Sequence, residues 1–138
     1  MSILRENAKM KLDQLIVTAN AINADNYYAY IINQIYVFGS YVNSDKVKLG
    51  DLDIAMSMSI RDKYKGRDIA ELGIQRSEKQ ANNRSILSQM FFAQEETIIK
   101  LKGKQKSIHI GGIYDPDSNV DITKWLMLLC NGEYQTLL

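Results

Sequence analysis

The spacing of hydrophobic and polar positions divides the chain into helical and extended segments. Over residues 6–23 the apolar side chains recur at the spacing of one helical face, which predicts an amphipathic helix. Its apolar positions are Leu12, Leu15, Ile16, Ala19 and Ile22. Aromatic and β-branched residues then predict a strand over residues 35–38, which is too apolar to be an exposed edge.

A second strand is predicted over residues 51–56, where the side chains alternate in character. Asp51 and Asp53 fall on one side, whereas the apolar residues between and after them fall on the other. Between the two strands, Gly39 permits a tight turn and Ser40 is a short polar residue at a helix start. The polar residues 41–49 are predicted to form a short helix or a loop.

The rest of the chain is predicted to alternate helices with one more strand. A loop is expected over residues 57–73, with a short helix at 68–72, followed by a helix that begins at Ser77 and a short one over 95–101. Residues 107–113 alternate as a third strand, with Ser107, His109 and Gly111 on one face. A last helix, capped by Asp121, is expected over residues 122–129.

Composition favours one intracellular domain. A chain of 138 residues with 46% hydrophobic content fits a single domain over 1–138, and a net charge of +1 gives no strong nucleic-acid signal. The lone Cys130 allows no disulfide within the chain, which suggests a reducing compartment. No signal-peptide core and no long apolar run is present, so we expect a cytoplasmic protein without a membrane segment.

The two aspartates are the main candidates for chemistry. One intervening strand residue places Asp51 and Asp53 about 6 to 7 Å apart along the chain and on the same side. Such carboxylates suit Mg²⁺, which takes hard oxygen ligands and completes its shell with water and substrate phosphates. Amide groups of the Gly39-Ser40 turn could hold those phosphates. The combination indicates metal-assisted phosphoryl or nucleotidyl transfer.

The spacing also resembles a known signature. Gly39-Ser40, ten intervening residues and Asp51-x-Asp53, with an apolar strand on either side, is similar to the motif of the nucleotidyltransferase superfamily, whose core is the DNA polymerase β-like palm. Among its members the chain most resembles the small, single-domain minimal nucleotidyltransferases. The expected order of helices and strands agrees with that family over nearly the whole chain.

This resemblance implies an α+β fold with a mixed sheet flanked by helices. It implies ATP or another nucleoside triphosphate as substrate and two Mg²⁺ ions as cofactors, with Asp51 and Asp53 as metal ligands and Gly39 and Ser40 at the triphosphate. In such enzymes an acceptor hydroxyl attacks the α-phosphorus and pyrophosphate leaves. The expected activity is transfer of a nucleoside monophosphate, AMP above all, to a hydroxyl of a protein or a small molecule.

The chain departs from the family at two places. The resemblance implies a third acidic residue on the next core strand, where this chain has Ser107, His109 and Gly111, and a basic arginine after the Gly-Ser turn, where only Lys46 and Lys48 follow. Three interpretations remain open: His109 acts as a base, the third acid comes from elsewhere, or no transfer is catalysed. A strand histidine is more often a hydrogen-bonded structural residue, although imidazole can accept a proton near neutral pH.

Two other functions compete with catalysis. A nucleotidyltransferase fold without the third acid could serve as a binding module or antitoxin-like subunit, paired with a small helical HEPN-type protein through residues 122–129, or as a homodimer. Alternatively, the Asp-x-Asp pair is an ordinary acidic edge in an unrelated protein. The tyrosines before and within the Gly-Ser region fit either packing or a base-stacking surface. They are Tyr27, Tyr28, Tyr30, Tyr36 and Tyr41.

Overall fold

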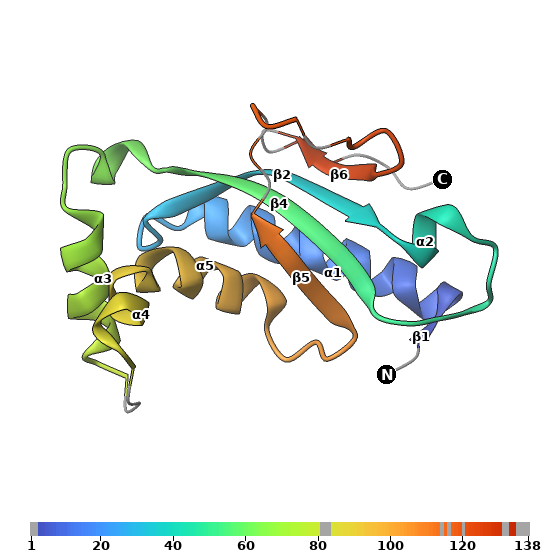
Figure 1. The fold of residues 1–138 in the computed structure, drawn as a ribbon, viewed down its shortest axis with the longest axis horizontal. Helices are drawn as coiled ribbons and strands as arrows, with labels where there is room; N and C mark the ends of the chain where they lie inside the picture. The colour runs from blue at the N-terminus through green and yellow to red at the C-terminus, as the bar shows by residue number, and fades with distance from the viewer. Residues whose placement is uncertain are drawn as a thin grey trace.

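A mixed β-sheet forms the centre of the molecule (Figure 1). The structure, a computed structural model, describes residues 3–80, 84–113, 115, 117–119, 121–130 and 133–134. The sheet has five strands in the order β5-β4-β2-β6-β7, with β4 and β5 parallel and the other neighbours antiparallel. Their bounds are β2 Tyr30–Phe38, β4 Leu52–Ile60, β5 Ile108–Ile113, β6 Leu126–Cys130 and β7 Glu133–Tyr134. The predicted α+β class with a mixed sheet is confirmed.

Two helices, α1 (Arg5–Ala24) and α5 (Phe92–Lys102), cover one face of the sheet (Figure 1). The predicted apolar face of α1 is buried, as are the alternate residues of β4 that pack beneath it. Ile54 and Met56 are fully buried in the same core as Leu12 and Ile22. The helix predicted over residues 6–23 and the alternation predicted over 51–56 are therefore confirmed.

The short elements lie at the two ends of the sheet (Figure 1). At the end where β2 finishes and β4 begins lie α2 (Ser40–Asn43) and the small pair formed by β1 (Ile3–Leu4) and β3 (Lys48–Leu49). At the other end lie the 3₁₀ turn η1 and helices α3 and α4. Their bounds are η1 Asp62–Tyr64, α3 Ile69–Ser77 and α4 Ile86–Met90.

The helix predicted over residues 122–129 is wrong, because residues 126–130 form strand β6. β6 pairs antiparallel with the side of β2 that β4 leaves open, and Leu128 and Leu129 are fully buried there. A short apolar run fits a buried strand as well as a helix, and the open edge of β2 decides between them. Asp121 does not cap a helix; its carboxylate accepts hydrogen bonds from the backbone N–H and the hydroxyl of Thr123.

The helix predicted to begin at Ser77 is also wrong, because α3 ends at that residue. The short helix predicted over 68–72 is instead the start of α3, which Asp68 caps by accepting from the N–H of Glu71. Gly73 does not end this helix. A Cβ there would lie 2.6 Å from the carbonyl oxygen of Gln89, so the glycine allows α3 to approach the α4 segment closely.

The chain between α3 and α5 exposes apolar side chains. Ile86, Leu87 and Phe91 are each about 60% exposed (63%, 61% and 59%), although their spacing is helical. Periodicity here predicts the helix α4 and the helix α5 that follows it, but it does not predict which side is covered.

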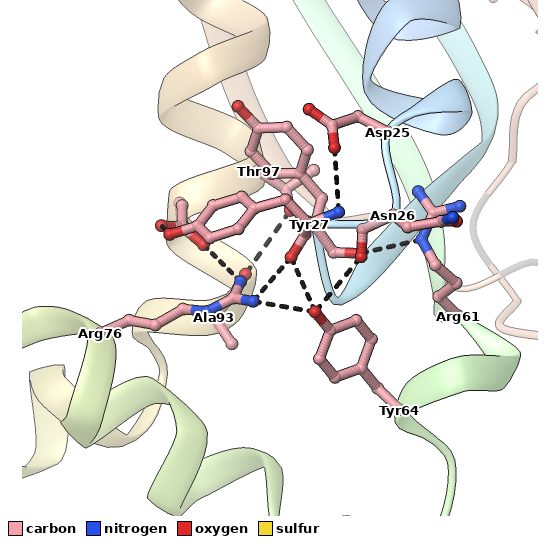
Figure 2. Close-up of polar contacts among 10 residues, drawn as sticks. Asp25, Asn26, Tyr27, Arg61, Tyr64, Arg76, Ala93 and Thr97 are labelled. Atoms are coloured by element: carbon pink, nitrogen blue, oxygen red, sulfur yellow. Dashed lines mark hydrogen bonds and ion pairs between the residues drawn. The ribbon is translucent and has the colours of Figure 1, made fainter.

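An arginine network attaches the α3 end to the core (Figure 2). The guanidinium of Arg76 donates to Glu96, to the carbonyl of Tyr27 and to the hydroxyl of Tyr64, and it lies 4.0 Å from the centre of the Tyr27 ring. Arg61 donates to three carbonyls at the end of α1 and the turn after it. Of the tyrosines considered for packing or base stacking, Tyr27 takes part in this network, which agrees with packing for that residue.

Among the described residues, no helix has the length and the apolar character that crossing a membrane requires.

Candidate functional site

Three adjacent strands bring the candidate residues into one row. The register pairs Phe38 of β2 with Asp53 of β4, and Asp53 with His109 of β5. The neighbouring residues Val37, Ile54 and Ile108 are buried on the helix side, so the row lies on the opposite face of the sheet. The site is therefore at the end of the sheet that carries α2 (Figure 1).

Gly39 lies in contact with Asp53. Its backbone has φ 81° and ψ −149°, a conformation that is essentially restricted to glycine. A Cβ at this position would lie 2.7 Å from Oδ2 of Asp53. The tight turn expected at Gly39 is confirmed, and it places the turn directly beside one of the two aspartates.

The second oxygen of Asp53 faces His109. Oδ1 lies 3.4 Å from Nδ1 of the imidazole, a long contact, with the two side chains 35% and 62% exposed. A Cβ on Gly111 would lie 4.0 Å from the imidazole Cε1 and 3.6 Å from the Phe38 ring, so the absence of a side chain there leaves room around His109. Asp53 thus lies between the Gly39 turn and the histidine.

The other two predicted residues, Asp51 and Ser40, lie close in sequence to the row of Phe38, Asp53 and His109. Asp51 is exposed and precedes β4 by one residue, and the N–H of Leu52 donates to the carbonyl of Ser107, so pairing of the strands reaches this point. Ser40 is the first residue of α2, and its carbonyl accepts from the hydroxyl of Ser44 at 2.7 Å.

Arg5 holds the loop that follows Gly39, a role that the sequence does not suggest. From the start of α1 its guanidinium donates to the carbonyls of Tyr41, Ser44 and Lys46 at 2.7, 2.7 and 2.9 Å. It also lies 5.2 Å from the centre of the Tyr41 ring. Because these partners are 36 to 41 residues away in sequence, no local pattern indicates the contact.

An aromatic cluster adjoins the row and was also not predicted. The Trp125 indole stacks on Phe38, with ring centres 5.1 Å apart, and lies 5.7 Å from Tyr36. Of the tyrosines considered as a stacking surface, only Tyr36 belongs to this cluster, and it is buried. Two features of the sequence could have indicated this cluster: the only tryptophan of the chain and the phenylalanine directly before Gly39.

The acidic residues suit a hard cation only in part. Asp51 and Asp53 offer carboxylate oxygens of the kind Mg²⁺ prefers, and both are accessible to a ligand. Across the described residues, no group of three or more His, Cys, Asp or Glu side chains is arranged to hold a metal. By donor type alone the pair matches a Mg²⁺ ion that takes its remaining ligands from water and substrate. No residue of the described β5 supplies the third acid.

The aspartates after β5 take part in turns. Asp115 accepts from the N–H of Asp117 at 2.9 Å. The pKa of Asp121 is lowered, first by the hydrogen bond from the Thr123 N–H and then by that from its hydroxyl. These contacts hold both carboxylates within local turns and give neither Asp115 nor Asp121 a place beside Asp53.

Comparison of the chain with models of protein families, with curated proteins and with solved structures found no match.

Proposed function

We propose that the protein is a magnesium-dependent nucleotidyltransferase that moves a nucleoside monophosphate from a nucleoside triphosphate to a hydroxyl group. The observation that supports this most is the contact between Gly39 and Asp53, since it joins the two halves of the Gly-Ser and Asp-x-Asp pattern. The Gly-Ser and Asp-x-Asp pattern by itself concerns only the spacing of these residues along the sequence. A glycine-only turn against the carboxylate is an additional, tertiary feature that such a site needs.

In the proposed reaction the acceptor oxygen bonds to the α-phosphorus as the bond to the β-phosphate oxygen breaks. Pyrophosphate carries away that electron pair, and the acceptor proton passes to a base or to water. Asp51 and Asp53 would hold Mg²⁺, which supplies stabilisation of charge on the phosphate oxygens. The Gly39-Ser40 turn would receive the triphosphate, and Arg5 would keep the loop after it in place.

The aromatic cluster offers a surface for the nucleobase. Phe38 and Trp125 are half-buried and stack beside Asp53 in the row, and aromatic faces accept any base. This arrangement favours stacking over a specific hydrogen-bond pattern. ATP is the first triphosphate to test, with the other three as alternatives.

His109 has two possible roles in this proposal. It can orient Asp53 by donating from Nδ1, or it can accept the proton of the attacking hydroxyl at Nε2. His109→Asn and His109→Gln separate these roles, because the Asn amide replaces a donor near Nδ1 and the Gln amide reaches toward Nε2. If orientation is the role, His109→Asn should retain most activity and His109→Ala should not; equal losses in all three variants would favour proton transfer.

The test of the function is incubation with labelled ATP, GTP, CTP or UTP, magnesium and a lysate. Label transfer should require magnesium and should fall at least a hundredfold in Asp51→Asn and Asp53→Asn, because each removes a ligand charge. Asp45→Asn is the matched control, since Asp45 is an exposed acid of the same loop. Absence of transfer with all four triphosphates, together with no magnesium-dependent thermal stabilisation by any of them, would refute the proposal.

A second candidate is a subunit of this fold that binds a partner without catalysis. The missing third acid near Asp51 and Asp53, within the described residues, favours it. The contact helix suggested for this role over residues 122–129 does not exist, because those residues lead into and form β6. Copurification of a small helical partner that is unchanged in Asp53→Asn, with no label transfer, would support this candidate over the enzyme.

A further inference from the structure

A second cleft lies away from the Asp53 row, between α1 and the turn that leads into β5. Its volume is about 770 Å³, and three lysines, Lys11, Lys104 and Lys106, are among the residues that line it. A smaller hollow continues from it and adds Lys100 and Lys102. Among the described residues, no acidic side chain lines either hollow. A chain with a net charge of +1 thus collects five lysines at one place without a carboxylate among them.

The contacts of these lysines leave most of their hydrogen-bonding capacity unused. The Lys11 ammonium donates to Oε1 of Gln105 at 2.6 Å, which uses one of its three N–H groups. Within the described part of the chain, the ammonium groups of Lys104 and Lys106 have no hydrogen bond or ion pair. Like charges that line one cleft repel one another, so an anion bound among them would be stabilised.

A buried hydroxyl provides an independent indication of a ligand. Ser107 lines the larger cleft, is 5% exposed, and its Oγ has no hydrogen-bond partner. A buried hydroxyl without a partner is unfavourable, and an acceptor oxygen brought into the cleft would satisfy it. Ser107 is also held in place, because its carbonyl accepts from the N–H of Leu52 at 2.7 Å.

Two features within the protein define the walls of the cleft. The bond between Lys11 and Gln105 ties α1 to the turn, and Gly103 ends α5 with a positive φ of 57°, the value that turns the chain back toward β5. The remaining lining residues are apolar Ile3, Leu4 and Met10 and polar Asn7 and Gln14. The site thus combines a cationic part with room for an uncharged organic group.

We propose that this cleft binds the diphosphate or triphosphate group of a small molecule, through Lys11, Lys104, Lys106 and the hydroxyl of Ser107. A ligand group with three or four negative charges is a better charge match for several ammonium groups than a ligand with a single carboxylate. The cleft is separate from the Asp53 row, because the residues that line it do not include Asp53 or its row neighbours Phe38 and His109. The proposal therefore stands or falls independently of nucleotidyl transfer.

The experiment is calorimetric titration of the full chain with sodium pyrophosphate at low salt and with EDTA, so that no metal takes part. We expect binding that weakens as salt rises. Lys104→Gln/Lys106→Gln should raise the Kd at least tenfold, and Ser107→Ala should raise it about threefold or more without loss of thermal stability, since it removes an unsatisfied hydroxyl. Lys9→Gln/Lys79→Gln is the control, because it removes the same charge from exposed positions outside the cleft.

Three results would overturn the proposal. The first is an equal loss of pyrophosphate binding in the two double variants, which would show a general charge effect. The second is loss of binding in Asp53→Asn, which would assign pyrophosphate to the other site. The third is absence of pyrophosphate binding while single-stranded RNA binds and depends on Lys104 and Lys106, which would make the cleft part of a nucleic-acid surface. Comparison of pyrophosphate with ADP and a sugar bisphosphate then tells whether the organic group contributes.

Discussion

Replacement of Gly39 by alanine tests the central feature of the candidate site. The Cβ would lie 2.7 Å from Oδ2 of Asp53, closer than an ordinary contact of 3.4 to 4 Å. The backbone must also keep φ 81° and ψ −149°, which a residue with a side chain rarely adopts. The substitution therefore strains the turn and displaces the carboxylate at the same time.

The expected loss has two parts. A residue with a Cβ in this backbone region costs about 1–3 kcal/mol. The Asp53 side chain is 35% exposed and can rotate away, so displacing it adds only the loss of an exposed contact with His109, about 0–1 kcal/mol. Together these parts predict that Gly39→Ala lowers the free energy of unfolding by about 1–4 kcal/mol.

Urea denaturation followed by tryptophan fluorescence is the appropriate assay. Trp125 is the only tryptophan and stacks on Phe38, the residue before Gly39. Two glycines separate the parts of the effect. Gly66→Ala places a Cβ at φ 84° with no atom within 4 Å, so it reports backbone strain alone, and Gly50→Ala has neither a positive φ nor a close neighbour.

A double-mutant cycle then isolates the contact itself. In an Asp53→Ala background, Gly39→Ala should lose the part of its effect that comes from the carboxylate and retain the backbone part. If Gly39→Ala changes the free energy of unfolding by no more than Gly50→Ala, within about 0.5 kcal/mol, the strained turn at Gly39 is refuted. If its effect equals that of Gly66→Ala, the close approach to Asp53 contributes nothing to stability.

Three further predictions concern the rest of the fold. Arg76→Met should lower the free energy of unfolding by about 3–5 kcal/mol, because it leaves the 14%-exposed Glu96 side chain without its cation; a loss no larger than that of Glu96→Gln in urea denaturation would contradict this. Arg5→Lys keeps the charge but cannot reach all its carbonyls, so it should cost about 1–3 kcal/mol and speed hydrogen exchange over residues 40–47; unchanged exchange there would refute the bracing role. Burial, then the hydrogen bond to Glu96, raises the pKa of Tyr27, so its neutral form is favoured in the folded state. That stability is fully present below about pH 10, the ordinary tyrosine value, and is lost as pH rises through the higher folded pKa. Denaturation between pH 8 and 11 should show this decline, and Tyr27→Phe should reduce it; an unchanged slope in that variant would assign the decline to other groups.

Local periodicity predicted the parts of this fold that depend on one buried face. The spacing of Leu12, Leu15 and Ile22 predicted α1, and the alternation around Asp53 predicted β4, because each pattern matches one element type over enough residues. The predicted strands were too short, however. β2 and β4 each have nine residues, since they continue to pair with each other beyond the motif.

The sequence alone predicted the wrong type of element for a short apolar run. Residues 126–129 are apolar throughout, so they fit a helix or a buried strand, and only the open side of β2 selects the strand. Gly73 lies inside α3 and allows it to approach the backbone of Gln89 closely, a contact between two segments that the sequence does not indicate.

The candidate site divides in the same way. The sequence alone predicted the turn at Gly39, the candidate carboxylates of Asp51 and Asp53, and the lack of an acid at position 109. Each of these depends only on residue type and spacing. Only the tertiary structure decided that Gly39 touches Asp53, that His109 lies beside it, and that Arg5 braces the loop. These contacts depend on strand register and join residues 14 to 56 positions apart, which no local pattern encodes.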